Sequence, residues 1–185
     1  MTSKLTFHPA TEADASQLQQ LIECAFRAVD SREGWTDDLG LSSSFRIDLQ
    51  EVLAMINKPD IVMLMATNDE KKLVGSIGTA KRDANHARLF MLAVDPSQQH
   101  SGIGRQVLAY AEDYCRQTWG VSTLCLNALS NRLQLITWYS RHGYEETGET
   151  SPFPREKFEK LDLPEDLCFV EFEKILPSAS VYQAE

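Results

Sequence analysis

Apolar residues recur along this chain with two different periods, and the change of period predicts where helices and strands lie. Spacings of three and four residues, typical of an amphipathic helix, occur in four segments: 13–29, 47–56, 102–119 and 132–141. Alternating or short continuous apolar runs, typical of strands, occur in six segments: 5–8, 61–66, 73–80, 88–94, 121–126 and 167–175. A seventh strand is expected at 144–149. The polar stretch 30–44 is predicted to be a loop.

Capping residues support several of these boundaries. Thr11 is followed three residues later by Asp14, which is an N-cap signal for the first helix. Gly120 follows the third helix and is predicted to be its C-terminal cap. Gly143 marks the end of the fourth helix in the same way.

The order of these elements favours one domain of the α/β or α+β class. The helix at 102–119 stands between two strands, which predicts at least one parallel crossover in a single sheet covered by helices. No repeat, low-complexity segment or linker divides the chain. We therefore expect residues 1–176 to form one domain and residues 177–185 to form a flexible C-terminal tail.

The composition narrows the classes of function. The 185 residues include 18 Lys and Arg and 27 Asp and Glu, so the net charge is −9. This charge disfavours binding through phosphates, and neither nucleic acid nor an anionic membrane is an expected partner. No apolar run has the length of a signal peptide or a membrane span, so a cytoplasmic protein is expected. The four cysteines and four histidines lack metal-ligand spacing, which predicts no metal site.

The segment between the strand at 88–94 and the helix at 102–119 has features of an anion site. Gly102 and Gly104 stand where the helix begins. Amide groups at a helix N-terminus attract anions, and a residue without Cβ lets a phosphate approach the backbone. Neither a GxGxxG nor a P-loop motif is complete. Taken alone, these residues indicate either a phosphate loop or a glycine-containing turn.

The longer pattern resembles a known family. Gln99-x-x-Gly102-x-Gly104, preceded by Val94-x-Pro96, is similar to the coenzyme A pyrophosphate loop of the GCN5-related N-acetyltransferases, the GNAT superfamily. The resemblance implies an N-acetyltransferase that uses acetyl-CoA as its cosubstrate.

Two other segments extend the resemblance over most of the chain. Residues 7–14 resemble the opening strand and turn of these enzymes, and residues 138–144 resemble their late aromatic-Tyr-x-x-x-Gly-aromatic signature. The implied GNAT fold is a single mixed, mostly antiparallel sheet of about seven strands, flanked by about four helices. That sheet is splayed between strands 4 and 5, which here would be residues 88–94 and 121–127.

The resemblance also implies where acetyl-CoA binds. Backbone groups of Leu92 and Val94 would pair with the pantetheine arm like an added strand, and the N–H groups from His100 to Arg105 would hold the pyrophosphate. Gln99 would stand at the entrance of the loop, and Asn131 resembles the family's asparagine near the pantetheine arm. The implied cofactor-binding residues are therefore Leu92, Val94, Gln99, His100, Ser101, Gly102, Ile103, Gly104, Arg105 and Asn131.

Tyr139 is the candidate catalytic residue. It is similar to the tyrosine that, in many members, donates a proton to the departing coenzyme A thiolate. A phenol is protonated at pH 7 and is able to act as a general acid. The pattern alone would fit equally a core residue beside Trp138.

A general base is less well defined. Some members carry a carboxylate on the fourth strand, but residues 88–94 contain none before Asp95. The proton of the amine must therefore pass to another carboxylate or to ordered water. The carboxylates considered for this role are Asp37, Asp38, Asp83 and Glu171.

Trp35 stands in the long polar loop, with Asp37 and Asp38 close behind it. An aromatic face near carboxylates is suited to a cation, so these three residues are candidates for binding the amine acceptor. Trp35 would otherwise anchor the loop. Residues 147–154 resemble a segment of a subset of these enzymes and either cover the acceptor side or form a Pro-containing crossing loop.

The expected function is transfer of an acetyl group from acetyl-CoA, by direct attack, to a primary amine of a small molecule or of a protein or peptide. We expect the protein to be a monomer or a homodimer, and we expect no metal to be required. Two other classes stay open: a noncatalytic acyl-CoA-binding regulatory module, and a protein-interaction adaptor that uses Trp35. Only the adaptor would not bind coenzyme A.

Overall fold

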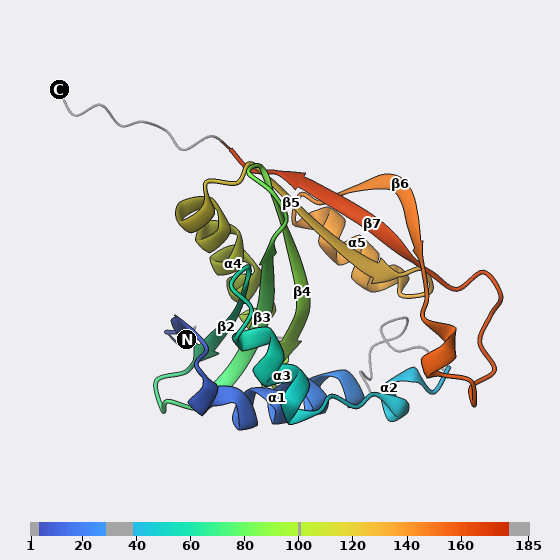
Figure 1. Ribbon diagram of the computed structural model, residues 1–185, viewed down its shortest axis with the longest axis horizontal. Helices are drawn as coiled ribbons and strands as arrows, with labels where there is room; N and C mark the ends of the chain where they lie inside the picture. The colour runs from blue at the N-terminus through green and yellow to red at the C-terminus, as the bar shows by residue number, and fades with distance from the viewer. Residues whose placement is uncertain (1–3, 29–38, 100, 178–185) are drawn as a thin grey trace.

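The computed structural model describes residues 4–28, 39–99 and 101–177, which form one seven-stranded sheet with helices on both faces (Figure 1). The strands are β1 (Thr6–Pro9), β2 (Ile61–Thr67), β3 (Leu73–Lys81), β4 (His86–Val94), β5 (Thr123–Leu129), β6 (Glu145–Pro152) and β7 (Cys168–Ile175). Across the sheet they lie in the order β1-β2-β3-β4-β5-β7-β6. Neighbouring strands are antiparallel except β4 and β5, which are parallel.

Five α-helices connect these strands: α1 (Ala15–Arg27), α2 (Leu41–Ser44), α3 (Leu49–Ile56), α4 (Ile103–Trp119) and α5 (Leu133–Arg141). Short 3₁₀ turns are η1 (Glu12–Asp14), η2 (Pro96–Gln98) and η3 (Arg155–Lys157). Thr11 and Asp14 form the expected capping box at η1, immediately before α1. Gly120 ends α4 in the left-handed conformation, with φ +66°, as its position predicts.

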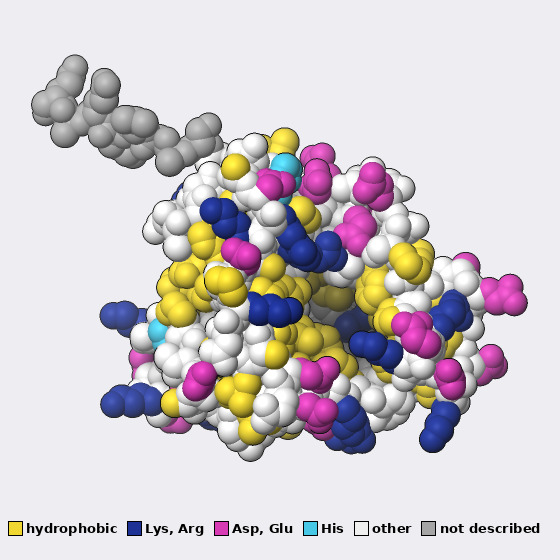
Figure 2. All heavy atoms as spheres, in the orientation of Figure 1, with side chains coloured by type: hydrophobic (Ala, Val, Ile, Leu, Met, Phe, Trp, Pro, Cys, Tyr) yellow, Lys and Arg dark blue, Asp and Glu magenta, His cyan; other side chains and the backbone are white. Residues whose placement is uncertain are grey.

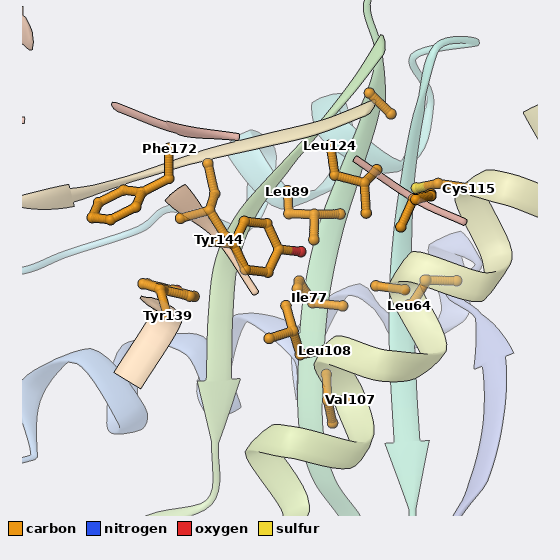
Figure 3. Packing of buried hydrophobic residues seen from close by; sticks show 14 of the residues in the cluster. Leu64, Ile77, Leu89, Val107, Leu108, Cys115, Leu124, Tyr139, Tyr144 and Phe172 are labelled. Carbon is orange, nitrogen blue, oxygen red and sulfur yellow. The ribbon is translucent and has the colours of Figure 1, made fainter. Parts of the chain in front are cut away.

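The larger apolar core lies between the sheet and α4. Val107, Leu108 and Cys115 of α4 pack on buried residues of the central strands, such as Ile77 and Leu89 (Figure 3). On the other face, α1 and α3 cover a second core formed with the side chains of β2. Both faces of the central strands are therefore buried, which fixes β4 between two helical layers.

A third apolar cluster joins segments that are far apart in the sequence. Leu41 of α2 packs with Phe153 and Leu167, which lie at the two ends of the connection between β6 and β7. This connection therefore packs against α2, so that the end of the sheet carrying β6 and β7 is tied to this helix.

The predicted fold is confirmed, whereas several predicted boundaries are displaced. The strand expected at 121–126 is β5, which begins at Thr123 and ends at Leu129. The strand expected at 144–149 continues to Pro152, so much of the segment 147–154 is strand and not a loop. Residues 41–44 of the predicted loop form α2. Of the expected tail, residues 178–185 lie outside the described residues. No helix in the described ranges has the length and apolar character needed to cross a bilayer.

Candidate active site

The sheet opens between β4 and β5. Only three residue pairs join these strands, from His86↔Thr123 to Arg88↔Cys125, although β4 has nine residues. Beyond Arg88 the two strands diverge, which is the expected splay. In the view of Figure 2, the surface is hollowed between the region of β4 and that of β5 and β7, and apolar side chains form much of its floor.

The backbone of β4 presents hydrogen-bonding groups to this opening. The N–H of Asp95 donates to the carbonyl of Val74 in β3, at 2.9 Å. Because successive amides of a strand point in opposite directions, the N–H groups of Val94 and Leu92 point away from β3. Met91, with φ +51°, lies at a bulge where β4 has one extra residue opposite β3. The open edge is thus suited to an extended ligand that contains amides.

Asp95 fixes the start of the loop that follows β4. Its Oδ1 accepts hydrogen bonds from the backbone N–H of Ser97 (2.9 Å) and from the Ser97 hydroxyl (2.7 Å). Its Oδ2 lies 2.6 Å from Nζ of Lys72, in the turn between β2 and β3. Burial alone would raise the pKa of Asp95, but the hydrogen bonds from Lys72 and Ser97 outweigh it and lower that pKa. The loop is therefore capped by an anionic side chain anchored to a neighbouring hairpin.

The N-terminus of α4 supplies the anion-binding groups. Gly102 is the N-cap residue and has φ +80°, a conformation that favours glycine. The first helical hydrogen bond runs from the Gln106 N–H to the Gly102 carbonyl, at 3.2 Å. The N–H groups from Ile103 to Arg105 thus precede the helical bonding pattern and point out of the helix end. The Ile103 side chain is buried, so only its backbone is available to a ligand.

Gly104 brings α5 close to this helix end. A Cβ at Gly104 would lie 3.6 Å from Cγ2 of Val94 and 4.0 Å from Cζ2 of Trp138, which are ordinary contact distances. Trp138 on α5 therefore stands beside the first turn of α4. The opening is bounded on this side by the loop, the helix end and the aromatic residues of α5.

Tyr139 follows Trp138 on α5 and is almost buried, with 8% of its surface exposed. Its ring lies near those of Tyr144 and Phe172, at centroid distances of 5.9 Å and 6.2 Å (Figure 3). Burial raises the pKa of Tyr139 to about 12, with a small opposing effect of Arg132. Within the described part of the chain its hydroxyl makes no hydrogen bond. Tyr139 is thus a core residue whose phenol stays protonated. A place in the core is therefore compatible with the predicted role as a proton donor.

Four polar side chains from four strands meet where β4 and β5 separate, and we call them the apex cluster: Arg88, Asn127, Ser151 and Glu171. Glu171 is the centre, because its Oε1 accepts from Nδ2 of Asn127 (3.1 Å) and Oγ of Ser151 (2.6 Å), and its Oε2 accepts from Nη1 of Arg88 (3.1 Å). Burial tends to raise the pKa of Glu171, but these three donors outweigh it and lower that pKa. The cluster therefore holds a stable carboxylate.

The other candidates from the sequence are placed differently. Trp35, Asp37, Asp38 and His100 lie outside the described residues. Asn131 is exposed in the turn before α5. Gln99 is half-buried and Ser101 and Arg105 are exposed at the loop. Asp83 lies in the turn before β4, at the opposite end of that strand from the loop, and accepts from the N–H of Asn85 (2.7 Å) and of His86 (2.9 Å). The geometry thus separates Asp83 from the opening.

Sequence reasoning did not foresee most of the apex cluster. Arg88 and Asn127 are polar residues in otherwise apolar strands, which was the available signal. Their convergence on Glu171 depends on the pairing of β5 with β7, in which Asn127 stands opposite Glu171. Among the described residues, no three His, Cys, Asp or Glu side chains form a group suited to a metal ion.

A splayed sheet whose open strand leads into a glycine-containing helix N-terminus defines the class of acyl-CoA-dependent transferases. The acetyltransferase (GNAT) family model matches residues 16–144, more than half of the chain, and the chain belongs to this family. The recognition made from the loop motif is thereby confirmed. No curated protein sequence matches the chain.

Solved structures share the fold at low sequence identity. The ribosomal-protein-S18-alanine N-acetyltransferase from Escherichia coli is 17% identical with a TM-score of 0.70, over 98% of this chain and 100% of that chain. PaiA N-acetyltransferase from Thermoplasma acidophilum, in complex with coenzyme A, is 17% identical with a TM-score of 0.69, over 94% and 99%. Spermidine N-acetyltransferase from Vibrio cholerae, in complex with CoA and spermine, is 12% identical with a TM-score of 0.65, over 92% and 95%.

Proposed function

We propose that this N-acetyltransferase moves the acetyl group of acetyl-CoA directly to a primary amine of a small molecule or of a protein or peptide. One observation carries the proposal: the open edge of β4 is followed along the chain by η2 and then by the N-terminus of α4. An extended arm with amides and a pyrophosphate at its end needs these two features in this order. Membership of the acetyltransferase family supports the same chemistry.

The cofactor is proposed to lie along this continuous surface. Backbone groups of Leu92 and Val94 pair with the pantetheine arm, and the N–H groups from His100 to Arg105 hold the pyrophosphate, where the helix end favours negative charge. Gln99 stands at the entrance of the loop, and Asn131 stands near the arm. Asp95 has no direct contact in this proposal; it holds the loop in place through Ser97.

Acetyl transfer needs one attack and one departure. The amine nitrogen attacks the thioester carbon, and backbone donors near Leu92 and Val94 stabilise the negative oxygen of the tetrahedral intermediate. The carbon–sulfur bond then breaks, and Tyr139 donates its proton to the thiolate. Because the three donors around Glu171 lower its pKa, it is a weak base, and we assign the proton of the amine to ordered water.

No covalent acyl-enzyme is required. Cys115 is buried, and burial together with Glu112 raises the pKa of its thiol to about 12, which suppresses the nucleophilic thiolate. Burial and Glu173 likewise raise the pKa of Cys125. All four cysteines are free, which supports the proposal of a reducing compartment such as the cytoplasm.

The acceptor is proposed to enter opposite the cofactor. Trp35, Asp37 and Asp38 precede α2, which packs against the connection between β6 and β7. In this proposal Asp37 and Asp38 attract the amine before it loses its proton, and Trp35 provides an aromatic wall.

Release of free thiol from acetyl-CoA across a panel of primary amines tests the function. We expect thiol release that depends on the amine, with one acetylated amine formed for each thiol. Binding of acetyl-CoA without thiol release for any amine would indicate a noncatalytic acyl-CoA-binding module. Absence of acetyl-CoA binding would indicate an interaction adaptor.

A further inference from the structure

The apex cluster lies on one face of the sheet, at the closed end of the opening. Ala87 and Leu89 are buried in the core beneath α4, so Arg88, between them, points to the opposite face. That face is the one covered by α1 and α3, and Phe90, next on it, packs in their core. In the view of Figure 2, Lys and Arg side chains stand around the hollow between β4 and the β5–β7 region.

The hydrogen-bonding capacity of the cluster is unevenly used. Both carboxylate oxygens of Glu171 accept from protein donors, with three hydrogen bonds in all. Arg88 has five N–H donors, and only Nη1 is engaged with a described residue. Its side chain is 23% exposed, so part of the side chain is accessible. Among the described residues, the hydrogen-bonding capacity that the cluster leaves unused therefore consists of N–H donors of Arg88.

In the proposed orientation of acetyl-CoA, its thioester end points along β4 toward Arg88. In the proposed function the pyrophosphate lies beyond Val94, and the pantetheine arm runs back along β4 toward Leu92. Continuing in this direction leads to Arg88, which precedes Leu92 by four strand residues, or about 13 Å. Part of that span is filled by the thioester and the acceptor amine. Arg88 is thus placed to meet the far end of a small acceptor.

We propose that Arg88 binds a carboxylate of the acceptor, so that the substrate is an amine that also carries a carboxylate, such as an amino acid or the end of a short peptide. This inference rests on the proposed function. The planar guanidinium matches a carboxylate through two parallel hydrogen bonds. Glu171 holds the guanidinium through Nη1, and the other N–H donors of Arg88 bond no described residue. The positioning role of Glu171 is in turn supported by Asn127 and Ser151.

Two other roles of the cluster make different predictions. If the Arg88–Glu171 pair only braces the splay, then removing either charge impairs all acceptors alike. If Glu171 instead binds a second ammonium group, then diamines are the better substrates, and removing Glu171 impairs them. If Arg88 binds a carboxylate of the acceptor, substitution of Arg88 impairs the carboxylate acceptors, whereas substitution of Glu171 improves them.

The test compares matched acceptors that differ at one end. Thiol release is measured with amino acids and dipeptides, with their C-terminal amides, and with linear diamines of similar length. We expect kcat/KM for the carboxylate acceptors to exceed that for the amides by about 10- to 100-fold, as for loss of one charge-assisted hydrogen bond, and the difference to lie mainly in KM. Equal use of acids and amides, or a preference for diamines, would overturn the proposal.

Two variants then assign the effect to Arg88. We expect Arg88→Met to abolish the preference for carboxylates. We expect Arg88→Lys to retain part of it, because lysine keeps the charge but cannot form the two parallel hydrogen bonds of a guanidinium. We expect Glu171→Gln to lower the KM of carboxylate acceptors, because the guanidinium is no longer neutralised while Asn127 and Ser151 still have an amide oxygen to bond. Equal losses for acids and amides in both variants would show a brace only.

A separate measurement checks whether the Arg88→Met variant is folded. Arg88→Met leaves Glu171 without its counter-charge, so the double variant with Glu171→Gln is compared with it by thermal unfolding and must show the same loss of preference. Arg116→Met, which removes an arginine paired with Asp113 on the surface of α4, is the matched control and leaves the preference unchanged.

If no amine supports thiol release, the proposed function fails. Binding of N-acetyl amino acids to the coenzyme A complex, compared by NMR with their methylamides, then decides the role of Arg88.

Discussion

The two sides of the opening are built by different means. The proposed cofactor side is a single stretch of the sequence from β4 to α4, and it offers backbone groups: the edge of β4 and the first N–H groups of the helix. The apex cluster consists of side chains from β4, β5, β6 and β7, held together by hydrogen bonds to Glu171. A backbone site of this kind tolerates many side chains, whereas a site of converging side chains changes with each substitution. We therefore expect the proposed cofactor site to tolerate substitutions better than the apex cluster does.

Gly104→Glu should break the cofactor side most completely. The Cβ has room at this position, but the carboxylate would face the pyrophosphate, and a like-charge contact costs several kcal/mol, so coenzyme A affinity should fall by more than about 100-fold. Calorimetry measures the affinity, and thermal unfolding checks that the fold survives. Gly104→Ala is the control and should bind far better than the Glu variant. Unchanged binding in a folded Gly104→Glu protein would refute the position of the cofactor.

Tyr139→Phe should slow the reaction without moving either site. The hydroxyl bonds no described residue, so its loss should leave stability and acetyl-CoA affinity intact while kcat falls by about 10²-fold or more.

Tyr144→Phe is the matched control, because this buried neighbour donates a hydrogen bond to Oε1 of Glu112 at 3.0 Å. Its loss should cost about 1 to 3 kcal/mol of unfolding free energy and leave kcat unchanged. Wild-type turnover in Tyr139→Phe would make Tyr139 a core residue only.

Asp95→Ala should loosen the loop and weaken the cofactor site by a smaller amount. Loss of this cap removes about 1 kcal/mol, which corresponds to a several-fold increase in the dissociation constant of coenzyme A. Asp83→Ala removes a similar cap at the other end of β4 and should lower the melting temperature without affecting that constant. Equal effects of the two variants on coenzyme A binding would mean that the cap of Asp95 has no special relation to the loop.

The contribution of Tyr139 to the pH dependence should be the smallest effect over the ordinary range. Tyr139 is an acid whose pKa is raised to about 12, so its proton is present at all lower pH values and is lost only as the pH rises toward that value. With a lysine-like amine, kcat/KM should therefore rise as the amine loses its proton, up to about pH 10, with no falling limb below it. An observed fall with an apparent pKa near 8 to 9 would assign proton donation to another group.

The same contrast explains what the sequence could and could not predict. Gly102 and Gly120 lie in local patterns whose meaning depends on a few neighbours, and both ends of α4 were predicted correctly. The seven strands were also found, six of them because their apolar runs are local. The ends of β5 and β6 were displaced, because pairing with β7 extends β5 to Leu129 and β6 to Pro152.

The apex cluster depends on contacts between distant parts of the chain. Glu171 was considered only as a general base, and nothing near it in the sequence indicates that Arg88, 83 residues away, would meet its carboxylate. The order β4-β5-β7-β6 creates this meeting, and no local motif encodes that order. Tyr139 is intermediate, because its motif predicts its chemistry whereas its burial follows from the packing of α5 on β7.

Amide hydrogen exchange on β4, measured by NMR with and without coenzyme A, tests whether the cofactor lies along the open edge of β4 and ends at the N-terminus of α4. This position of the cofactor is the centre of the proposed function. It predicts that the amides of Leu92 and Val94 and those from Ile103 to Arg105 exchange more slowly in the complex, while the amides of β1 and β2 do not change. Unchanged exchange of Leu92 and Val94 in a saturated complex would contradict it and would place the pantetheine arm elsewhere.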